Sequence, residues 1–219
     1  MPRQNRIILA IYCSRRKVNM QKTPNLILAS SSVTRRNLLD QLRIPYEIDK
    51  PEIDETLHAG ETAQAACLRL AQEKAMRVSK RHPVAVVIGS DQLVESGGRI
   101  FGKPGHADGA QAQLQSLSGQ RINFHVAVAV FAPDAPPQLW HEVVVVQMRT
   151  LSNEEISRYI QLETPFNSAG SMKSEGLGAT LIDSMQSRDP SAILGLPLIA
   201  TARMLREVGI DPLRQALGK

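Results

Sequence analysis

Aromatic residues, cysteines and long apolar runs are all scarce in this chain. Phe, Trp and Tyr make up only 4% of its 219 residues, so stacking platforms for single-stranded nucleic acid are few. Two cysteines, Cys13 and Cys67, provide neither a disulfide framework nor metal-ligand spacing, and we expect a reducing, cytoplasmic setting. The apolar run Ile7 to Cys13 is too short to span a membrane, so we expect no membrane partner.

The net charge of +5 is concentrated at the N-terminus. Residues 1–22 contain six basic residues and no acidic one, which leaves 20 Lys and Arg against 21 Asp and Glu, or −1, for the rest of the chain. A nucleic-acid-binding module is therefore disfavoured, although the basic segment itself could contact nucleic acid or membrane. We expect residues 1–22 to be a flexible basic extension and residues 23–219 to be a single domain.

An apolar run without alternation, Val84 to Ile88, leads into Gly89, Ser90 and Asp91. Such a run indicates a strand that is buried on both faces. Asp91 would then lie at the carboxyl end of a central strand, where ligands bind in α/β sheets. Taken alone, the stretch supports equally well an aspartate that caps a following turn or helix.

A second short apolar run, Leu26 to Ala29, is followed by three serines and then by a helical pattern that contains Arg35 and Arg36. A serine is a good N-cap. Free backbone N–H groups at a helix start, together with hydroxyls and two arginines, favour a phosphate site. The alternative is a solvated helix start whose arginines point into water.

Other segments predict helices, turns and paired strands. Helical patterns cover residues 62–80, 106–117 and 152–162, the last with a capping box at Ser152, and Pro197 begins a final helix with Ile199, Met204, Leu205 and Val208 on its core face. Residues 95–98 form a hairpin turn signal. The strands 122–131 and 139–149 are expected to pair antiparallel across a loop at 132–137.

Lys74, the acidic loop 51–55 and Lys103 are further candidates for the site. Lys74 interrupts an apolar stripe of the helix 62–80. The simpler interpretation is that its side chain extends along the rim of the buried surface and keeps its ammonium group in water. The alternative is that it reaches into a polar site. The acidic loop 51–55 could bind a hard cation or be merely solvated. Lys103 follows the hairpin and is thereby expected opposite Asp91.

One carboxylate among many cations and a hydroxyl-rich helix start suits hydrolysis of a phosphate anhydride. Charge stabilisation and positioning of water would provide most of the catalysis, with Asp91 deprotonating or orienting the water. No nucleophile elbow, Walker A loop, dinucleotide fingerprint or zinc motif is present in the sequence.

These residues resemble the signatures of the Maf family of nucleoside triphosphate pyrophosphatases. The stretch Ala29-Ser30-Ser31-Ser32-Val33-Thr34-Arg35-Arg36 is similar to the opening motif of that family. Five further motifs follow in its order: Ile53-Asp54-Glu55, Gln72-Glu73-Lys74-Ala75, Gly89-Ser90-Asp91-Gln92, Gly102-Lys103-Pro104 and Gly195-Leu196-Pro197. The resemblance runs from about residue 25 to residue 213.

The resemblance implies an α/β fold with a mixed, curved sheet flanked by helices and two lobes around a central cleft, as in Maf and ITPase-like proteins. It also implies a catalytic domain in which water attacks the α-phosphate and diphosphate leaves. Asp91 falls on the position of the proton acceptor. The positions that bind phosphates or line the cleft are matched by Ser30, Arg35, Arg36, Lys74, Lys103 and Lys173.

Base choice in the family is governed at positions matched by Thr34, Gln92 and Glu175. The Gly-Ser-Asp-Gln form and the loop 169–176 resemble the branch that acts on 7-methyl-GTP. The branch that acts on dTTP and UTP is the alternative, and a non-catalytic nucleotide sensor in cell division is a third. Two departures from the family pattern are Val126-Ala127 in place of Thr-Gly, and Thr34 where relatives often have tryptophan.

The resemblance further implies a divalent cation, Mg²⁺ or Mn²⁺, as cofactor, with ligands that the sequence does not identify. The expected partner is a nucleoside triphosphate substrate, and not nucleic acid or a membrane. A homodimer is compatible with the sequence. The expected role is removal of modified nucleotides.

Overall fold

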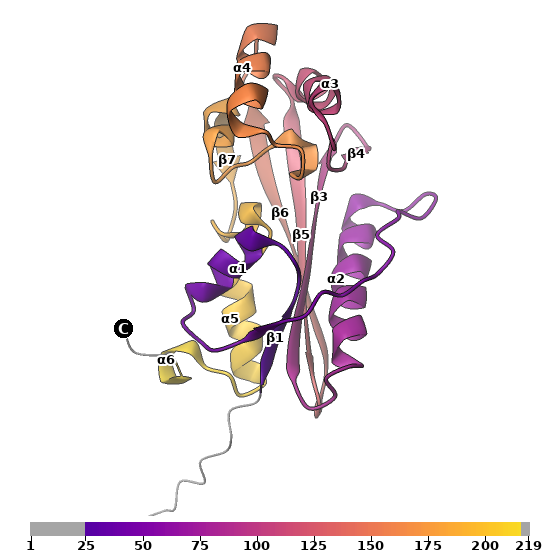
Figure 1. Ribbon diagram of the computed structural model, residues 1–219, viewed down its shortest axis with the longest axis vertical. Helices are drawn as coiled ribbons and strands as arrows, with labels where there is room; N and C mark the ends of the chain where they lie inside the picture. Colours follow the sequence, from indigo (N-terminus) through magenta and orange to yellow (C-terminus); the bar gives the residue numbers. More distant parts are fainter. Residues whose placement is uncertain (1–24, 216–219) are drawn as a thin grey trace, which may run out of the picture.

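The structure, a computed structural model, describes residues 25–215. The basic extension predicted for residues 1–22, with Cys13, lies outside the described residues. Within them, a single sheet of seven strands runs the length of the molecule (Figure 1). Among the described residues, no helix is both long enough and apolar enough to cross a membrane.

The sheet is mixed and open, as predicted. Six strands follow the order β2-β1-β3-β5-β6-β7, and β4 pairs with β3 away from this path. Strand β1 pairs parallel with β2 and β3, whereas the pairs β3–β4, β3–β5, β5–β6 and β6–β7 are antiparallel. The bounds are β1 Leu26–Ala29, β2 Glu47–Ile48, β3 Val86–Ser96, β4 Arg99–Phe101, β5 Arg121–Ala132, β6 Ala135–Met148 and β7 Ile182–Gln186.

Helices cover both faces of the sheet (Figure 1). The α-helices are α1 Val33–Asp40, α2 Ala63–Ser79, α3 Ala107–Leu117, α4 Asn153–Glu163, α5 Leu198–Glu207 and α6 Pro212–Gln215, with short 3₁₀ turns η1 Ala169–Ser171, η2 Leu177–Leu181 and η3 Ala192–Leu194. The predicted serine caps are confirmed at Ser32 and at the capping box of Ser152, and Thr62 caps α2 in the same way. Each cap satisfies a backbone N–H that the first helical turn leaves unpaired.

The core divides along strand β3 into two lobes. In one lobe, Val86 and Ile88 pack with α1 and α5 on one face of the sheet, while Val87 packs with α2 on the other. In the other lobe, Val94 belongs to a cluster that includes residues of α3 and α4. The residues between these contacts, including Ser90, Asp91 and Gln92, therefore lie where the two lobes meet.

Gly89 is required by a close approach of helix α2 to strand β3. A Cβ atom at this position would lie against the carbonyl oxygen of Ala71 and 2.6 Å from the backbone nitrogen of Ala75. Both contacts involve helix backbone, which cannot move aside as the end of a side chain can. The missing side chain thus lets α2 lie directly on the strand that carries Asp91.

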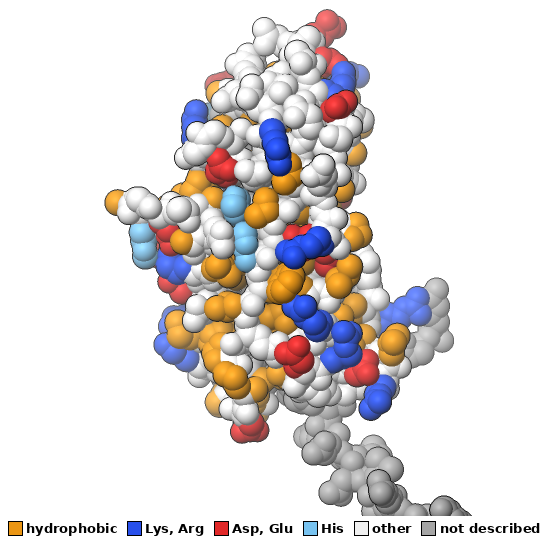
Figure 2. Space-filling model, turned by 180° about the vertical axis from the view of Figure 1, so that it is seen from behind, with side chains coloured by type: hydrophobic (Ala, Val, Ile, Leu, Met, Phe, Trp, Pro, Cys, Tyr) orange, Lys and Arg blue, Asp and Glu red, His pale blue; other side chains and the backbone are white. Residues whose placement is uncertain are grey.

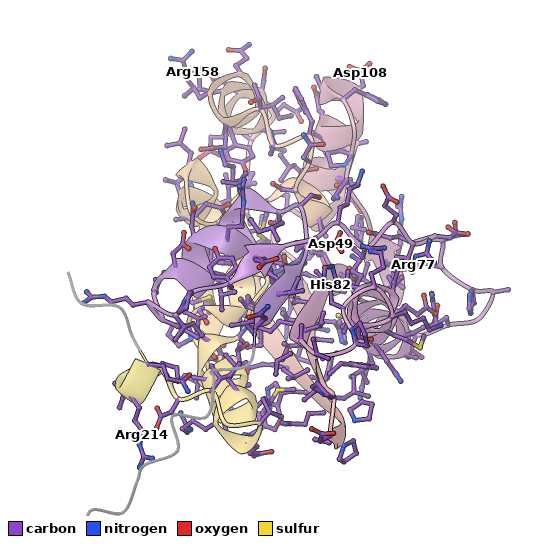
Figure 3. All side chains as sticks on the ribbon, turned by 60° about the horizontal axis from the view of Figure 1, so that its bottom comes forward. Asp49, Arg77, His82, Asp108, Arg158 and Arg214 are labelled. Carbon is purple, nitrogen blue, oxygen red and sulfur yellow. The ribbon has the colours of Figure 1, made fainter. Side chains whose placement is uncertain are left out.

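The edge strand β2 is held by a polar cluster at its end. Asp49 accepts hydrogen bonds from Arg81 and interacts with His82, whose Nε2 lies 2.9 Å from Asp49 Oδ2. Figure 3 shows Asp49 and His82 close together beside α2. These contacts fasten the edge of the sheet to the end of α2.

Three details of the predicted elements were wrong. Asp91 does not lie at a strand end, because β3 continues to Ser96; the parallel pairing with β1 ends at Gly89 instead. The loop predicted at 132–137 is shorter, since β6 already begins at Ala135. Ile199 is 62% exposed, and the buried face of α5 consists of Ala200, Thr201, Met204 and Leu205.

The face of the molecule shown in Figure 2 carries both basic and acidic side chains. This agrees with the near-neutral balance that the sequence predicts outside the first 22 residues.

We expect Gly89→Ala to destabilise the fold by about 3 kcal/mol, because the added methyl group meets helix backbone and forces α2 away from β3. Urea unfolding measures the change. Gly102→Ala is the matched control, since a Cβ atom there meets nothing within 4 Å. Equal stability of the two variants would contradict the close-packing argument.

Candidate active site

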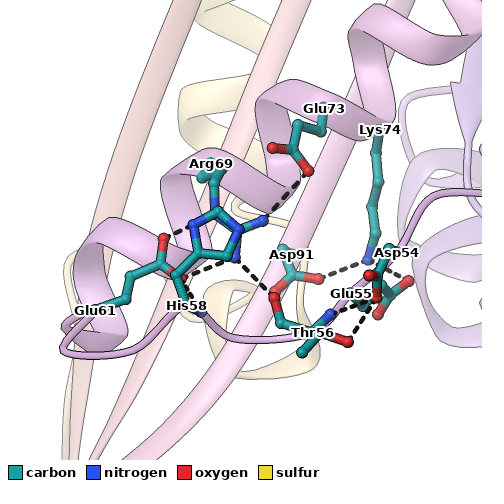
Figure 4. Close-up of polar contacts among 9 residues, drawn as sticks. All are labelled: Asp54, Glu55, Thr56, His58, Glu61, Arg69, Glu73, Lys74 and Asp91. Atoms are coloured by element: carbon teal, nitrogen blue, oxygen red, sulfur yellow. Dashed lines mark hydrogen bonds and ion pairs between the residues drawn. The ribbon is translucent and has the colours of Figure 1, made fainter.

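A buried ion pair forms the centre of the candidate site. Lys74 of α2 and Asp91 of β3 are both only 5% exposed. Lys74 Nζ lies 2.6 Å from Asp91 Oδ1 and 2.9 Å from Glu55 Oε1 (Figure 4). One ammonium group thus bridges two carboxylates from two distant segments. The rim interpretation of Lys74 was wrong, and so was the interpretation of Asp91 as a cap.

The charges around Asp91 oppose the effect of its burial. Burial raises the pKa of Asp91 above its ordinary value, and the positive charges of Lys74 and Arg35 act in the other direction. Burial also works to raise the pKa of Glu55, but Lys74, Lys103 and Arg35 together hold that pKa below its usual value. Glu55 therefore carries the firmer negative charge, and Asp91 is the better candidate to accept a proton.

The loop that carries Glu55 is ordered by its own hydrogen bonds (Figure 4). Asp54 Oδ1 accepts from both the backbone and the hydroxyl of Thr56, and Arg69 of α2 donates to the carbonyl of Thr56 and to Glu61. Arg69 thereby fastens the loop to α2, the helix that also carries Lys74. This acidic loop is consequently not merely solvated, because Glu55 is directed into the site.

The hydroxyl-rich turn before α1 reaches the same region. Ser30 Oγ accepts from the backbone N–H of Ser32, and Ser32 Oγ accepts from that of Arg35. Arg35 does not point into water: its Nε donates to the carbonyl of Gly195 at 2.9 Å. Arg36 has a buried Nε that finds no hydrogen-bond partner among residues 25–215, and its charge acts on Tyr46.

A turn around Gly195 connects α1 to strand β3. The carbonyl of Gly195 accepts from Arg35 and from the hydroxyl of Ser90, which is 2.7 Å away. The amide of Gln92 donates to the carbonyl of Ile193, also at 2.7 Å. Gly195 has φ +95°, and a Cβ atom there would lie 3.3 Å from both Arg35 and Gln92. Only glycine suits this left-handed, crowded position.

The three residues expected to govern base choice all lie around the start of α1. Thr34 Oγ1 donates to Glu175 Oε1 at 3.0 Å. Gln92 meets the same Gly195 turn as Arg35, which follows Thr34 in the chain. The loop 169–176 and strand β3 are thus both connected to one helix end, although 141 positions separate Thr34 from Glu175.

The remaining two lysines are placed differently from each other. Lys103 is exposed, and its charge contributes to the low pKa of Glu55, so the hairpin does bring it toward the site. Lys173 is not brought to Asp91; its Nζ instead pairs with Glu163 of α4 at 2.6 Å. Glu163 has the largest effect in raising the pKa of Lys173, and the charge of Glu175 adds to it.

Two contributors were not selected from the sequence. Glu55 was noticed only as one acid in a loop, since nothing local indicates that a lysine nineteen positions later would meet it. The carbonyl of Gly195 could not be identified as an acceptor, because backbone groups carry no residue signal. For a metal, no group of three or more His, Cys, Asp or Glu suited to bind one occurs within residues 25–215.

We expect Lys74→Met to leave a buried carboxylate without its cation and to cost about 3 kcal/mol of stability at about pH 8. In the variant, burial raises the pKa of Asp91 without the opposing effect of Lys74, so the folded chain holds the Asp91 proton more tightly than the unfolded chain. The stability of the variant should therefore fall as pH rises above about 4. The stability lost through the substitution is thus smaller at about pH 5 than at about pH 8. Urea unfolding at both pH values measures this.

Adding Asp91→Asn to Lys74→Met should restore most of the stability at the higher pH, because the unpaired charge is then gone. The exposed Lys103→Met serves as the control and should change stability little. An equal loss at both pH values would show that Lys74 acts through packing and not through charge.

Comparison with known proteins agrees with this arrangement. A family profile described as "Maf-like protein" matches residues 25–208. A protein of Bordetella avium named 7-methyl-GTP pyrophosphatase is 48% identical over 89% of this chain and 98% of its own length. Proteins with the same name from Xanthomonas campestris and Albidiferax ferrireducens are each 47% identical over 86% of this chain and over 98% and 95% of their own lengths.

Solved structures give only a distant likeness. The Staphylococcus aureus Ham1 protein is 16% identical, with a TM-score of 0.44 over 70% of this chain and 89% of that one. A score this low bears on neither fold nor activity. The family match and the relatives at 47–48% identity are decisive, and the chain belongs to the Maf family.

Proposed function

We propose that the chain is a nucleoside triphosphate pyrophosphatase that hydrolyses 7-methyl-GTP to 7-methyl-GMP and diphosphate. The observation that carries the proposal is the buried Asp91 carboxylate, held by Lys74 and surrounded by further cations. The names of the relatives at 47–48% identity supply the substrate. The role that follows is removal of modified nucleotides.

In this proposal Asp91 is the general base. Lys74 occupies Oδ1, and no residue between 25 and 215 donates a hydrogen bond to Oδ2, so Oδ2 can take a proton from water. The water oxygen forms a bond to the α-phosphorus, the bond from that phosphorus to the bridging oxygen breaks, and diphosphate leaves. Burial raises the pKa of Asp91, which strengthens it as a base once it is ionised.

The cations would hold the triphosphate. Ser30 and Arg35 lie at the start of α1, where backbone N–H groups and the helix dipole favour anions. Arg36 belongs to the same helical turn, and its side chain would have to turn outward to reach a phosphate, because its Nε is buried. Lys103 is within electrostatic reach of Glu55. Lys173 would have to exchange Glu163 for a phosphate oxygen, since the two side chains are paired at 2.6 Å.

A divalent cation, Mg²⁺ or Mn²⁺, belongs to the proposal. Mg²⁺ keeps several waters and binds through one or two carboxylates together with substrate phosphates. Glu55 and Asp91 converge on a single ammonium group, so two carboxylates are available in the right place. When bound, such an ion neutralises charge on the triphosphate.

Recognition of the base would involve Glu175, Thr34 and Gln92. A methylated guanine ring is cationic, and a carboxylate suits it. Glu175 is exposed and receives a hydrogen bond from Thr34, so its charge is accessible at the end of α1. Thr34 provides no aromatic face on which the base could stack. Recognition of the cationic base would therefore depend more on its electrostatic attraction to Glu175.

Four further expectations remain part of the proposal. We expect residues 23–219 to be one catalytic domain, in line with the family match over residues 25–208, and residues 1–22 to be a dispensable basic extension. We also expect a cytoplasmic protein that binds no nucleic acid, and a homodimer remains compatible with the chain.

We expect Asp91→Asn to lower kcat by a factor of about 10² to 10⁴ while nucleotide binding is kept or becomes tighter, because a negative charge near the phosphates is removed. Diphosphate release and calorimetric titration with nucleotide measure the two quantities. Glu73→Gln, a half-buried acid one position before Lys74, is the control and should keep its turnover. A nucleotide sensor would instead show no turnover in the unchanged chain.

We expect 7-methyl-GTP to be hydrolysed faster than GTP, dTTP and UTP when each is assayed with Mg²⁺ and with Mn²⁺. Glu175→Gln should reduce the preference for 7-methyl-GTP over GTP by about tenfold, the equivalent of one charge-assisted contact. If dTTP or UTP is the better substrate, the second branch of the family is the correct assignment. Gln64→Glu, an exposed change on α2, controls for a general effect of charge.

A further inference from the structure

Two histidines face each other on adjacent strands, apart from the residues of the proposed reaction. His125 Nδ1 and His141 Nε2 lie 3.2 Å apart. The ring centroids are 5.3 Å apart, and the ring planes differ by 25°. Since the centroids are farther apart than these nitrogens, the two nitrogens lie on the facing sides of the rings.

The backbone holds both rings on one face of the sheet. In the β5–β6 register Ala127 is opposite His141, and Val143 is opposite His125, so the two histidines are diagonal neighbours on the same face. That face is the one that α2 covers in part, because Ala127 packs against α2. The carbonyl of His125 also accepts from Cys67 of α2 at 3.2 Å. Both rings therefore project from rigid, paired strands.

The separation of the two nitrogens suits a shared metal ion. Two imidazole nitrogens at about 2.0–2.1 Å from Zn²⁺ are about 3.0–3.4 Å apart when they occupy neighbouring coordination positions. The observed 3.2 Å falls within this range. Both rings are half-buried and not fully enclosed, so an ion has access.

Charged side chains lie near both rings. Glu95 provides a favourable negative charge near His125, and Arg188 an unfavourable positive one near His141. The carboxylate of Glu95 is already bonded to Asn123 and to Gly98, so it acts through charge and not as a ligand.

We infer that His125 and His141 form a bidentate binding site for a divalent transition-metal ion of the Zn²⁺ and Ni²⁺ class, with water completing the coordination. Imidazole prefers these ions, whereas Mg²⁺ prefers oxygen ligands. The site is therefore chemically distinct from the cation expected with the nucleotide. A bound ion would join β5 to β6 beside the strand that carries Asp91.

Calorimetric titration of the full chain without nucleotide tests this inference, with ZnCl₂, NiCl₂ and MgCl₂ at about pH 7.5, where imidazoles are mostly neutral. We expect one Zn²⁺ or Ni²⁺ per chain in a binding step that the double variant His125→Gln/His141→Gln loses. Each single variant should bind about tenfold more weakly or worse, because a two-ligand chelate becomes a single ligand. Mg²⁺ should not produce this step.

The matched control is His58→Gln/His106→Gln, which removes two exposed histidines elsewhere and should keep the binding step. Any ions bound by acidic side chains are common to all variants, so the comparison isolates the pair. Circular dichroism of each variant establishes that it is folded, and the single variants serve if the double one is not. Equal Zn²⁺ affinity of the pair variant and the unchanged chain overturns the inference and leaves only a ring–ring hydrogen bond.

Discussion

The buried contact between Lys74 and Asp91 is the interaction on which the arrangement of this molecule depends. Burying two charges costs desolvation energy, which is offset only if the charges pair closely and further polar groups form hydrogen bonds with them. Here the lysine comes from a helix, its first carboxylate from a strand and its second, Glu55, from a loop. The contact requires these three segments to be in register. Burial raises the pKa of the aspartate against the opposing charge of the lysine, and a raised pKa is the property that a general base needs.

The backbone makes this contact available through Gly89. Because that residue has no side chain, α2 approaches β3 closely enough for Ala71 and Ala75 to touch the strand, and Lys74 then reaches Asp91 with both side chains buried. Strand β3 also passes from one lobe of the core to the other, with Ile88 and Val94 as its contacts on either side. Strand β3 therefore carries the proposed general base and also connects the two lobes of the core. The carbonyl of Gly195, which accepts hydrogen bonds from both Ser90 and Arg35, brings the start of α1 to the same place.

Local patterns identified most elements, since period, caps and turn residues act over a few positions. The strand at Leu26–Ala29, the cap at Ser32, the long helix α2 and the capping box at Ser152 were all predicted and are present. Errors occurred where the outcome depends on distant segments. Met204 and Leu205 of α5 are buried as predicted, but Ile199, which shares their helical periodicity in the sequence, is exposed. Likewise β3 extends past Asp91 because β5 pairs with it along that length.

By itself the sequence determined the class of fold, the family and the residue types of the site, because hydrophobic period, capping residues and the order of short motifs are written along the chain. Only the tertiary structure decided what those residues do to one another. In the folded chain Lys74 does not lie at the rim but pairs with the buried Asp91, and Thr34 donates a hydrogen bond to Glu175. Folding also sets His125 against His141. The physical reason is that charge, desolvation and hydrogen bonding depend on distance in space, and residues far apart in the chain share that distance only after folding.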